Sequence, residues 1–192
     1  NGDFETEKIG ATIFAYGFEW VSNKVDSHAF SRKLILRGNT ISTLSSPELI
    51  PTRYPSAGGH YDSAALYKNL KWDMSPKTTL TVGGRFTHTQ LKAQWNTSEE
   101  IYPTWLLKSP DLNLSKINVK NYALTGSLSL THRPSPNFQL NFLASSGFRS
   151  PNIDDLGKIR ESRGTLIIPN PLLKPEYANN LDFGVSFRTP NK

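Results

Sequence analysis

Long stretches of this 192-residue chain alternate apolar and polar side chains with a period of two. In residues 120–133 the even positions carry Tyr122, Leu124, Leu128 and Leu130, whereas the odd positions carry small or polar residues. A period of two places successive side chains on opposite faces of an extended strand. The pattern therefore predicts a β-strand with one apolar and one polar face.

The same pattern recurs along the chain and predicts six long strands. They cover residues 8–20, 60–73, 77–95, 120–133, 137–149 and 176–188. Only the second is ambiguous, because Lys68 interrupts the face formed by Leu66, Leu70 and Trp72. Helical spacing fits none of the segments better, and 13 Gly with 13 Pro disfavour helices. We predict an all-β fold, an antiparallel up-and-down meander.

The connections between these strands alternate strictly between short and long. Residues 74–76 and 134–136 are short turns, and residues 21–59, 96–118 and 150–175 are long loops, which a meander places at one end. Compact soluble domains rarely have loops longer than about 15 residues. Outer-membrane barrels have short turns at one end, long loops at the other, and strands of at least about nine residues.

Aromatic side chains near the strand ends support the membrane interpretation. Trp20, Trp72, Trp95 and Tyr122 lie where an interfacial aromatic belt would hold them, although each one alone would suit ordinary core packing. Membrane barrels need at least about eight strands to close. We therefore predict a partial segment, about six strands, of a large transmembrane β-barrel.

Composition removes several other classes of protein. The net charge of +6 comes from 22 Lys and Arg against 16 Asp and Glu, but the longest basic block is Arg32-Lys33, so no nucleic-acid partner is predicted. The chain has no cysteine, which excludes disulfides, thiolate metal sites and a cysteine nucleophile.

Two sequence boxes flank the last long loop. The first, Phe148-Arg149-Ser150-Pro151-Asn152, closes the fifth strand, and the second, Asn170-Pro171-Leu172-Leu173-Lys174-Pro175-Glu176-Tyr177, leads into the sixth. The pair resembles the signature of TonB-dependent outer-membrane receptors, and the boxes resemble those of the haem and siderophore receptor group. Residues 75–86, which end in Gly83-Gly84-Arg85-Phe86, are similar to a turn-plus-strand stretch of the same family.

The resemblance implies a plugged barrel in the bacterial outer membrane, with long loops extracellular and short turns periplasmic. It implies a receptor that takes up a scarce ligand, an iron complex of the siderophore or haem type, with energy relayed from the TonB complex through a plug domain. Residues 1–192 would be a fragment of one barrel domain, without the plug, the TonB box or the barrel C-terminus. Lipid and lipopolysaccharide are the implied membrane partners, and no cofactor or resident metal is expected.

The histidines give limited evidence for a ligand. Haem receptors of this family place a histidine between the two boxes, but none lies between Pro151 and Asn170, so that role is not transferred. His28 and His60, in or beside the first long loop, remain candidate contacts for iron or haem. His88 and His132 are expected to be structural.

Charge in the first long loop gives a further set of candidates. Lys24, Arg32, Lys33, Arg37 and Arg53 outnumber the acids Asp26 and Glu48. Such a loop would attract anionic ligands, and Arg37 and Arg53 could bind carboxylates, but lipopolysaccharide contact or solvation explains the charge equally well.

In the first box, Arg149 lies near Asp154 and Asp155. Arg149 is a candidate ligand contact, but we favour an ion pair that braces the loop, because the Pro-Asn pair indicates a tight turn.

No enzymatic motif is present. The sequence lacks a glycine-rich phosphate loop, a His-Glu-x-x-His motif and a Gly-x-Ser-x-Gly motif, so no catalytic residue is predicted. The alternative to a receptor segment is a soluble all-β domain that binds glycans or protein partners through its long loops.

Overall fold

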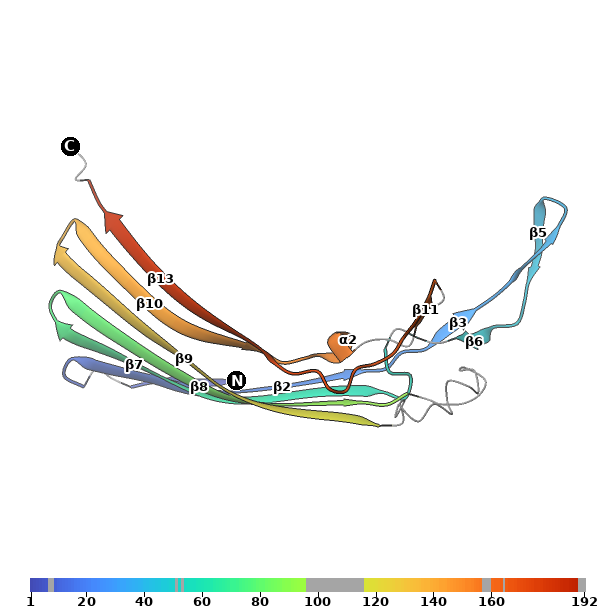
Figure 1. The fold of residues 1–192 in the computed structure, drawn as a ribbon, viewed down its shortest axis with the longest axis horizontal. Coiled ribbons are helices and arrows are strands. Elements are labelled where there is room, and N and C mark those ends of the chain that lie inside the picture. Colours follow the sequence, from blue (N-terminus) through green and yellow to red (C-terminus); the bar gives the residue numbers. More distant parts are fainter. Residues whose placement is uncertain are drawn as a thin grey trace.

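The structure, a computed structural model, describes residues 1–6, 9–50, 52, 54–95, 116–156, 160–163 and 165–189. Its main element is an antiparallel sheet of seven strands in the order β1-β2-β7-β8-β9-β10-β13, so that strands adjacent in the sheet follow one another along the chain (Figure 1). The strands are β1 (Gly2–Glu5), β2 (Thr12–Val25), β7 (Gly59–Ser75), β8 (Thr78–Ala93), β9 (Ile117–Ser135), β10 (Phe138–Arg149) and β13 (Glu176–Phe187). The predicted all-β meander is confirmed.

Short elements occupy two of the connections that the sequence predicted as loops. The first long connection carries β3 (Ala29–Ser31) paired with β6 (Glu48–Ile50), and β4 (Leu34–Arg37) paired with β5 (Thr40–Leu44). The last carries a single helical turn, α2 (Ile153–Leu156), and the hairpin of β11 (Arg160–Ser162) and β12 (Thr165–Ile167). Among the described residues, no helix has the length and apolar character needed to cross a membrane.

The first predicted strand, residues 8–20, is wrong at its start. Ile9 and Thr12 form an isolated bridge around a turn in which Gly10 has a φ of 62°, a conformation that glycine adopts without strain. The strand begins at Thr12, and the chain before the turn forms β1, which pairs Phe4 with Tyr16. A four-residue strand is too short for alternation to identify.

The short connections are tighter than predicted. β7 and β8 are joined by residues 76–77, and β9 and β10 by residues 136–137, instead of 74–76 and 134–136. Register shifts next to both turns, at Asp73/Ser75 and at Phe138/Leu140, lengthen the strands into the predicted turns.

Continuous register aligns the apolar positions of the six long strands. One row across the sheet joins residues that are paired from strand to strand: Phe14, Leu70, Val82, Leu128, Ala144 and Leu181. These side chains face away from the rest of the chain, and residues of this face such as Leu124 (76%) and Leu181 (75%) are largely exposed. One face of the sheet is therefore an uncovered apolar surface, and Lys68 does not interrupt the strand that carries it.

The opposite face is polar. The next row along the strands joins Ala15, Asn69, Gly83, Ser127, Ser145 and Asn180. On the same face Arg85 Nη2 donates to Glu19 Oε1 at 2.7 Å, and the Tyr67 hydroxyl donates to Asp3. These pairs satisfy the polar groups that are only partly exposed on this face.

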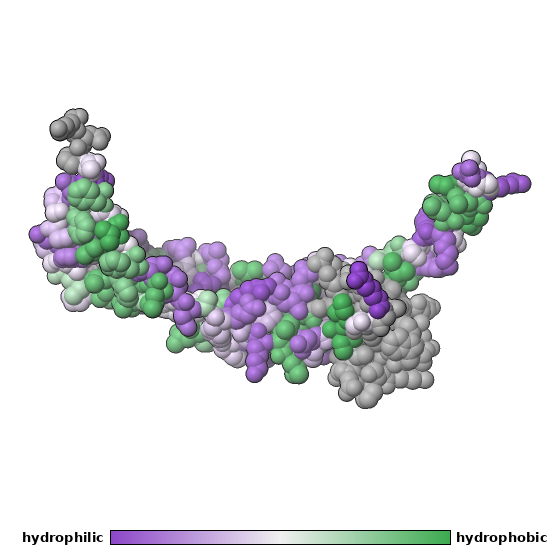
Figure 2. All heavy atoms as spheres, turned by 45° about the horizontal axis from the view of Figure 1, so that its top comes forward, coloured by the Kyte–Doolittle hydropathy of each residue, from purple (hydrophilic) through white to green (hydrophobic). Residues whose placement is uncertain are grey.

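The sheet is curved, and α2 lies over its concave side at the end where the long loops are (Figure 1). There α2 covers the small core, in which Ile153 and Leu156 pack with residues of β8 and β9 and with the second residue after β8: Leu91, Ala93, Trp95 and Ile117. Figure 2 shows exposed apolar side chains over the strands near β13 and again on the β4–β5 hairpin. The strands themselves have no second layer in the described part of the chain.

A polypeptide of residues 1–192 is expected to self-associate in detergent-free buffer. In the described residues, β1 and β13 each pair on one side only, and the apolar face is uncovered. Light scattering coupled to size-exclusion chromatography should give masses above the monomer in buffer and a monomeric polypeptide in detergent. A compact monomer with full strand content in plain buffer would contradict this expectation.

Candidate functional site

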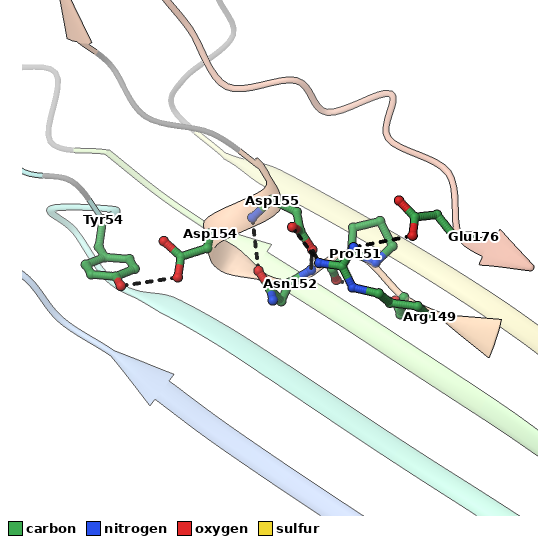
Figure 3. A network of polar contacts seen from close by, with 8 residues as sticks. Tyr54, Arg149, Pro151, Asn152, Asp154, Asp155 and Glu176 are labelled. Atoms are coloured by element: carbon green, nitrogen blue, oxygen red, sulfur yellow. Dashed lines mark hydrogen bonds and ion pairs between the residues drawn. The ribbon is translucent and has the colours of Figure 1, made fainter. Parts of the chain in front are cut away.

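Arg149 is the centre of a polar network at the long-loop end of the sheet (Figure 3). It is the last residue of β10 and pairs in register with Glu176, the first residue of β13. Its Nη1 lies 3.4 Å from Glu176 Oε2, and its Nη2 lies 2.8 and 2.9 Å from the two carboxylate oxygens of Asp155. Arg149 thus joins both ends of the loop 150–175 to the turn of helix that follows the first box.

Asn152 and Asp155 hold α2 by reciprocal bonds. The Asp155 N–H donates to Asn152 Oδ1 at 2.9 Å, and the Asn152 N–H donates to Asp155 Oδ2 at 3.0 Å. This is the geometry of a capping box, in which two otherwise unpaired backbone donors at a helix start are satisfied. The tight turn predicted after Pro151 is wrong, because Asn152 caps a helical turn instead.

The second box contacts the first directly. The Asn170 N–H donates to the Leu156 carbonyl at 2.7 Å, at the end of α2, and Asn170 Oδ1 accepts from the Leu172 N–H at 3.0 Å. Phe148 and Tyr177 add a ring contact with centroids 5.6 Å apart. The paired boxes are therefore the two halves of one clamp that closes the base of the last long loop.

The clamp also reaches the first long loop. Tyr54 donates its hydroxyl to Asp154 at 3.3 Å, and Ile153 packs so closely on Gly59 that an added Cβ would lie 3.0 Å from Ile153 Cδ1. Asp154 and Asp155 therefore serve different partners, one in each loop. Of these contacts the sequence predicted the Arg149–acid pairing, and it missed Tyr54.

Strand β10 stops pairing with β9 before it reaches the clamp, although it stays paired with β13. The β9–β10 pairing ends at Ser127 and Ser145, and beyond it Ser146 Oγ accepts from the Gly126 N–H at 2.9 Å. Ser150 Oγ lies 2.8 Å from Thr89 Oγ1 and accepts from Asn121 at 3.2 Å. Side chains replace the backbone ladder here, so the position of the clamp depends on hydroxyl and amide contacts.

The chemistry of the clamp is structural. The Arg149 guanidinium is matched by two carboxylates, so an anionic ligand would have to displace an existing partner. This geometry supports the bracing interpretation of Arg149 over a ligand clamp. Within the described residues, no group of three or more His, Cys, Asp or Glu side chains could hold a metal ion.

The structure does not bring the other candidate ligand contacts together. Arg37 ends β4, His28 precedes β3, and His60 lies in β7 opposite Lys24 and Lys92. Arg53 lies outside the described residues. None of the contacts between described residues joins any two of these candidates, so their role in binding remains a prediction.

Ion pairs in the first long loop leave part of its positive charge uncompensated. Lys24 lies 3.2 Å from Asp26, and Lys33 lies 3.6 Å from Glu48. The described part of this loop shows no carboxylate beside Arg32 or Arg37. Among the described cations of this loop, Arg32 and Arg37 are therefore the ones open to an anion.

A second polar site on the sheet was not predicted. The concave face holds a cavity of about 350 Å³ lined by Glu19, Tyr67, Asn69, Arg85 and neighbouring residues of β8, β9 and β10. Arg85 belongs to the Gly-Gly-Arg-Phe stretch that the sequence had marked, but only the strand register brings Glu19 next to it.

Comparisons with known proteins agree with this architecture. Residues 2–191 match the family model for the TonB dependent receptor-like β-barrel. No curated protein matches the sequence. Similar solved structures include the copper transporter OprC (TM-score 0.63, 15% identity, 95% of this chain and 26% of that chain). They also include the Serratia marcescens hemophore receptor HasR in complex with its hemophore HasA and heme (0.64, 18%, 98% and 28%). A third is the ferric yersiniabactin uptake receptor FyuA from Yersinia pestis (0.58, 12%, 97% and 25%).

Replacing Asp155 with alanine should loosen the clamp, because the variant loses both Arg149 contacts and half of the capping box. Amide hydrogen exchange of residues 152–156, Asn170 and Leu172 in the full-length protein should become about fivefold faster, equivalent to a lost capping interaction of about 1 kcal/mol. Lys174→Gln is the matched control, because Lys174 is exposed and makes no polar contact with a described residue. Unchanged exchange in Asp155→Ala would show that the clamp does not hold the loop.

Proposed function

This chain belongs to the TonB-dependent receptor-like β-barrel family, and we propose that it is part of a receptor that takes up an iron complex of the siderophore or haem type. The observation that carries the proposal is the family match over residues 2–191. The chain spans about a quarter of the solved structures it resembles, from 25% to 28% of their length. The activity of the whole protein is therefore a proposal. The family assignment favours a barrel wall over a soluble glycan-binding or protein-binding domain.

The location follows from the same assignment. The family points to the bacterial outer membrane, where the uncovered apolar face of the sheet meets lipid and the polar concave face lines the lumen. The two-residue turns would then be periplasmic and the clamped loops extracellular, with lipopolysaccharide around them. A plug domain that engages the TonB complex would supply the energy for uptake.

The class of ligand is supported by two observations. The similar structures are a copper transporter, a hemophore receptor in complex with its hemophore and heme, and a ferric yersiniabactin uptake receptor, so related folds handle metals and metal complexes. In this chain, Arg32 and Arg37 are open to an anion, and ferric chelates with carboxylates and haem with its propionates are anionic. His28 and His60 are retained as candidate iron or haem contacts. The bracing role of Arg149 makes it a positioning residue.

Uptake should be tested in iron-starved cells that produce the full-length receptor as their sole receptor of this family. We expect energy-dependent accumulation of hemin or of ferric citrate, abolished when TonB is deleted. Copper citrate serves as the competing metal complex. Uptake of copper alone, or equal uptake without TonB, would contradict the proposal.

A charge-reversed pair, Arg32→Glu with Arg37→Glu, should weaken binding of the anionic complex. Two repulsive contacts replace two attractive ones near the surface, so the Kd should rise by roughly tenfold at low salt, and the difference should shrink as salt is added. Isothermal titration of the purified full-length receptor measures both effects. Lys174→Glu places a reversed charge on the other loop and should change the Kd by less than about twofold. An unchanged Kd in the double variant would exclude these arginines as ligand contacts.

A further inference from the structure

Lys68 is a cation on the face of the sheet that meets lipid. It lies in β7 between Leu66 and Leu70, which point to the same side, and it pairs in register with Tyr16 and Gly84. Trp72 lies four residues closer to the periplasmic turn, which places Lys68 inside the apolar band. An ionisable side chain in this position indicates a functional site by default.

The Lys68 side chain bends toward the periplasmic side. Its Nζ lies 4.9 Å from the centroid of the Phe14 ring. Phe14 pairs with Leu70, one step nearer to the short turns, so the ammonium lies below its own Cα in the membrane. No ion pair joins Lys68 to a carboxylate of the described residues. The ammonium is therefore open to an anion that approaches from the periplasmic leaflet.

An apolar hollow lies beside Lys68 on the same face. The hollow measures about 560 Å³ and is lined mainly by Tyr16, Leu66, Phe86 and Leu124 around Gly84. A Cβ built on Gly84 would have no atom within 4 Å, so the space exists because residue 84 lacks a side chain. Glycine weakens a strand interior, and its presence often marks the close approach of another molecule.

We propose that this surface binds a phospholipid of the periplasmic leaflet, with the phosphate on Lys68 and an acyl chain in the hollow at Gly84. The polarity of the site matches a lipid of that leaflet, because the ammonium lies toward the periplasmic interface and the apolar hollow lies on the Leu66 and Leu124 side, toward the membrane centre. A lipopolysaccharide lies in the opposite leaflet, so its phosphates would lie on the extracellular side of the hollow, away from the Lys68 ammonium.

A second copy of the protein fits this surface less well. Membrane dimers related by a two-fold axis along the membrane normal bring equivalent residues together at the same depth. Such a contact centred on this surface would oppose Lys68 to Lys68, two like charges in a medium of low dielectric constant.

Native mass spectrometry of the purified, delipidated full-length receptor, titrated with dioleoylphosphatidylglycerol, tests the assignment. Lys68→Gln removes the charge, and Gly84→Leu fills the hollow. Lys68→Gln should lower occupancy of the first lipid adduct by about fivefold, the effect of losing one lysine–phosphate contact. Gly84→Leu should lower it by blocking the acyl chain, with Lys68 intact. Lys71→Gln is the matched control, because Lys71 lies three residues away on the polar face and should leave occupancy unchanged.

Wild-type occupancy in Lys68→Gln would overturn the proposal, as would equal losses in Lys68→Gln and Lys71→Gln. Glutamine is uncharged and only one atom shorter than lysine, so Lys68→Gln carries the test alone if Gly84→Leu does not fold, which circular dichroism reports. Lipid A is titrated in a parallel arm. Binding of lipid A that depends on Lys68, without such binding of phosphatidylglycerol, would contradict the assignment to the periplasmic leaflet. None of these outcomes depends on which cargo the receptor carries.

Discussion

Strand register, continuous except beside the two short turns, is the constraint on which the rest of the structure depends. Each of the six long strands has an apolar and a polar face, and pairing aligns these faces from Phe14 in β2 to Leu181 in β13. A slip of one residue at any pair would turn the whole of the following strand over and place its apolar side chains on the polar face. The apolar surface, the polar surface and the position of the clamp all follow from this one alignment.

Alternation in the sequence predicted the long strands well, because successive side chains of a strand point to opposite faces of the sheet and a period of two therefore marks a strand with two unlike faces. It failed where a segment is short or where its partners are distant. β1 and the β4–β5 hairpin have four or five residues per strand, too few for a period to stand out. Arg149 and Asp155 are close in sequence, so the sequence could predict their ion pair. Tyr54 and Asp154 are 100 positions apart, so it could not predict their contact. Such contacts depend on how α2 packs on the core, which no local pattern describes.

The clamp and the basic loop, both at the long-loop end of the sheet, differ in how their arginines are paired. Arg149 is already paired with Asp155 and Glu176, and these ion pairs hold the last loop over the sheet. Arg32 and Arg37 have no such partners in the described residues and remain available to an anion. A ligand that bound the clamp would have to break it. The boxes that resemble the family signature therefore explain why the loop has a fixed base, and the proposed anion contacts lie elsewhere, in the first long loop.

Register also shows that the exceptions to the apolar pattern lie together. Taken along the chain, Lys68, Gly84, Gly126, Ser146 and Asn179 look like unrelated faults in five strands. In the sheet, Lys68 pairs with Gly84, Gly84 with Gly126, and Ser146 with Asn179, while Ser146 bonds to Gly126. They form one row of small or polar positions across the apolar face of the sheet, which we propose meets lipid. A lysine in such a row would cost about 2–4 kcal/mol at the membrane midplane and about 0–1 kcal/mol near the interface. This difference in free energy favours the bend of the Lys68 side chain toward Phe14. A phosphate bound to the Lys68 ammonium would offset the remaining cost of placing the charge there.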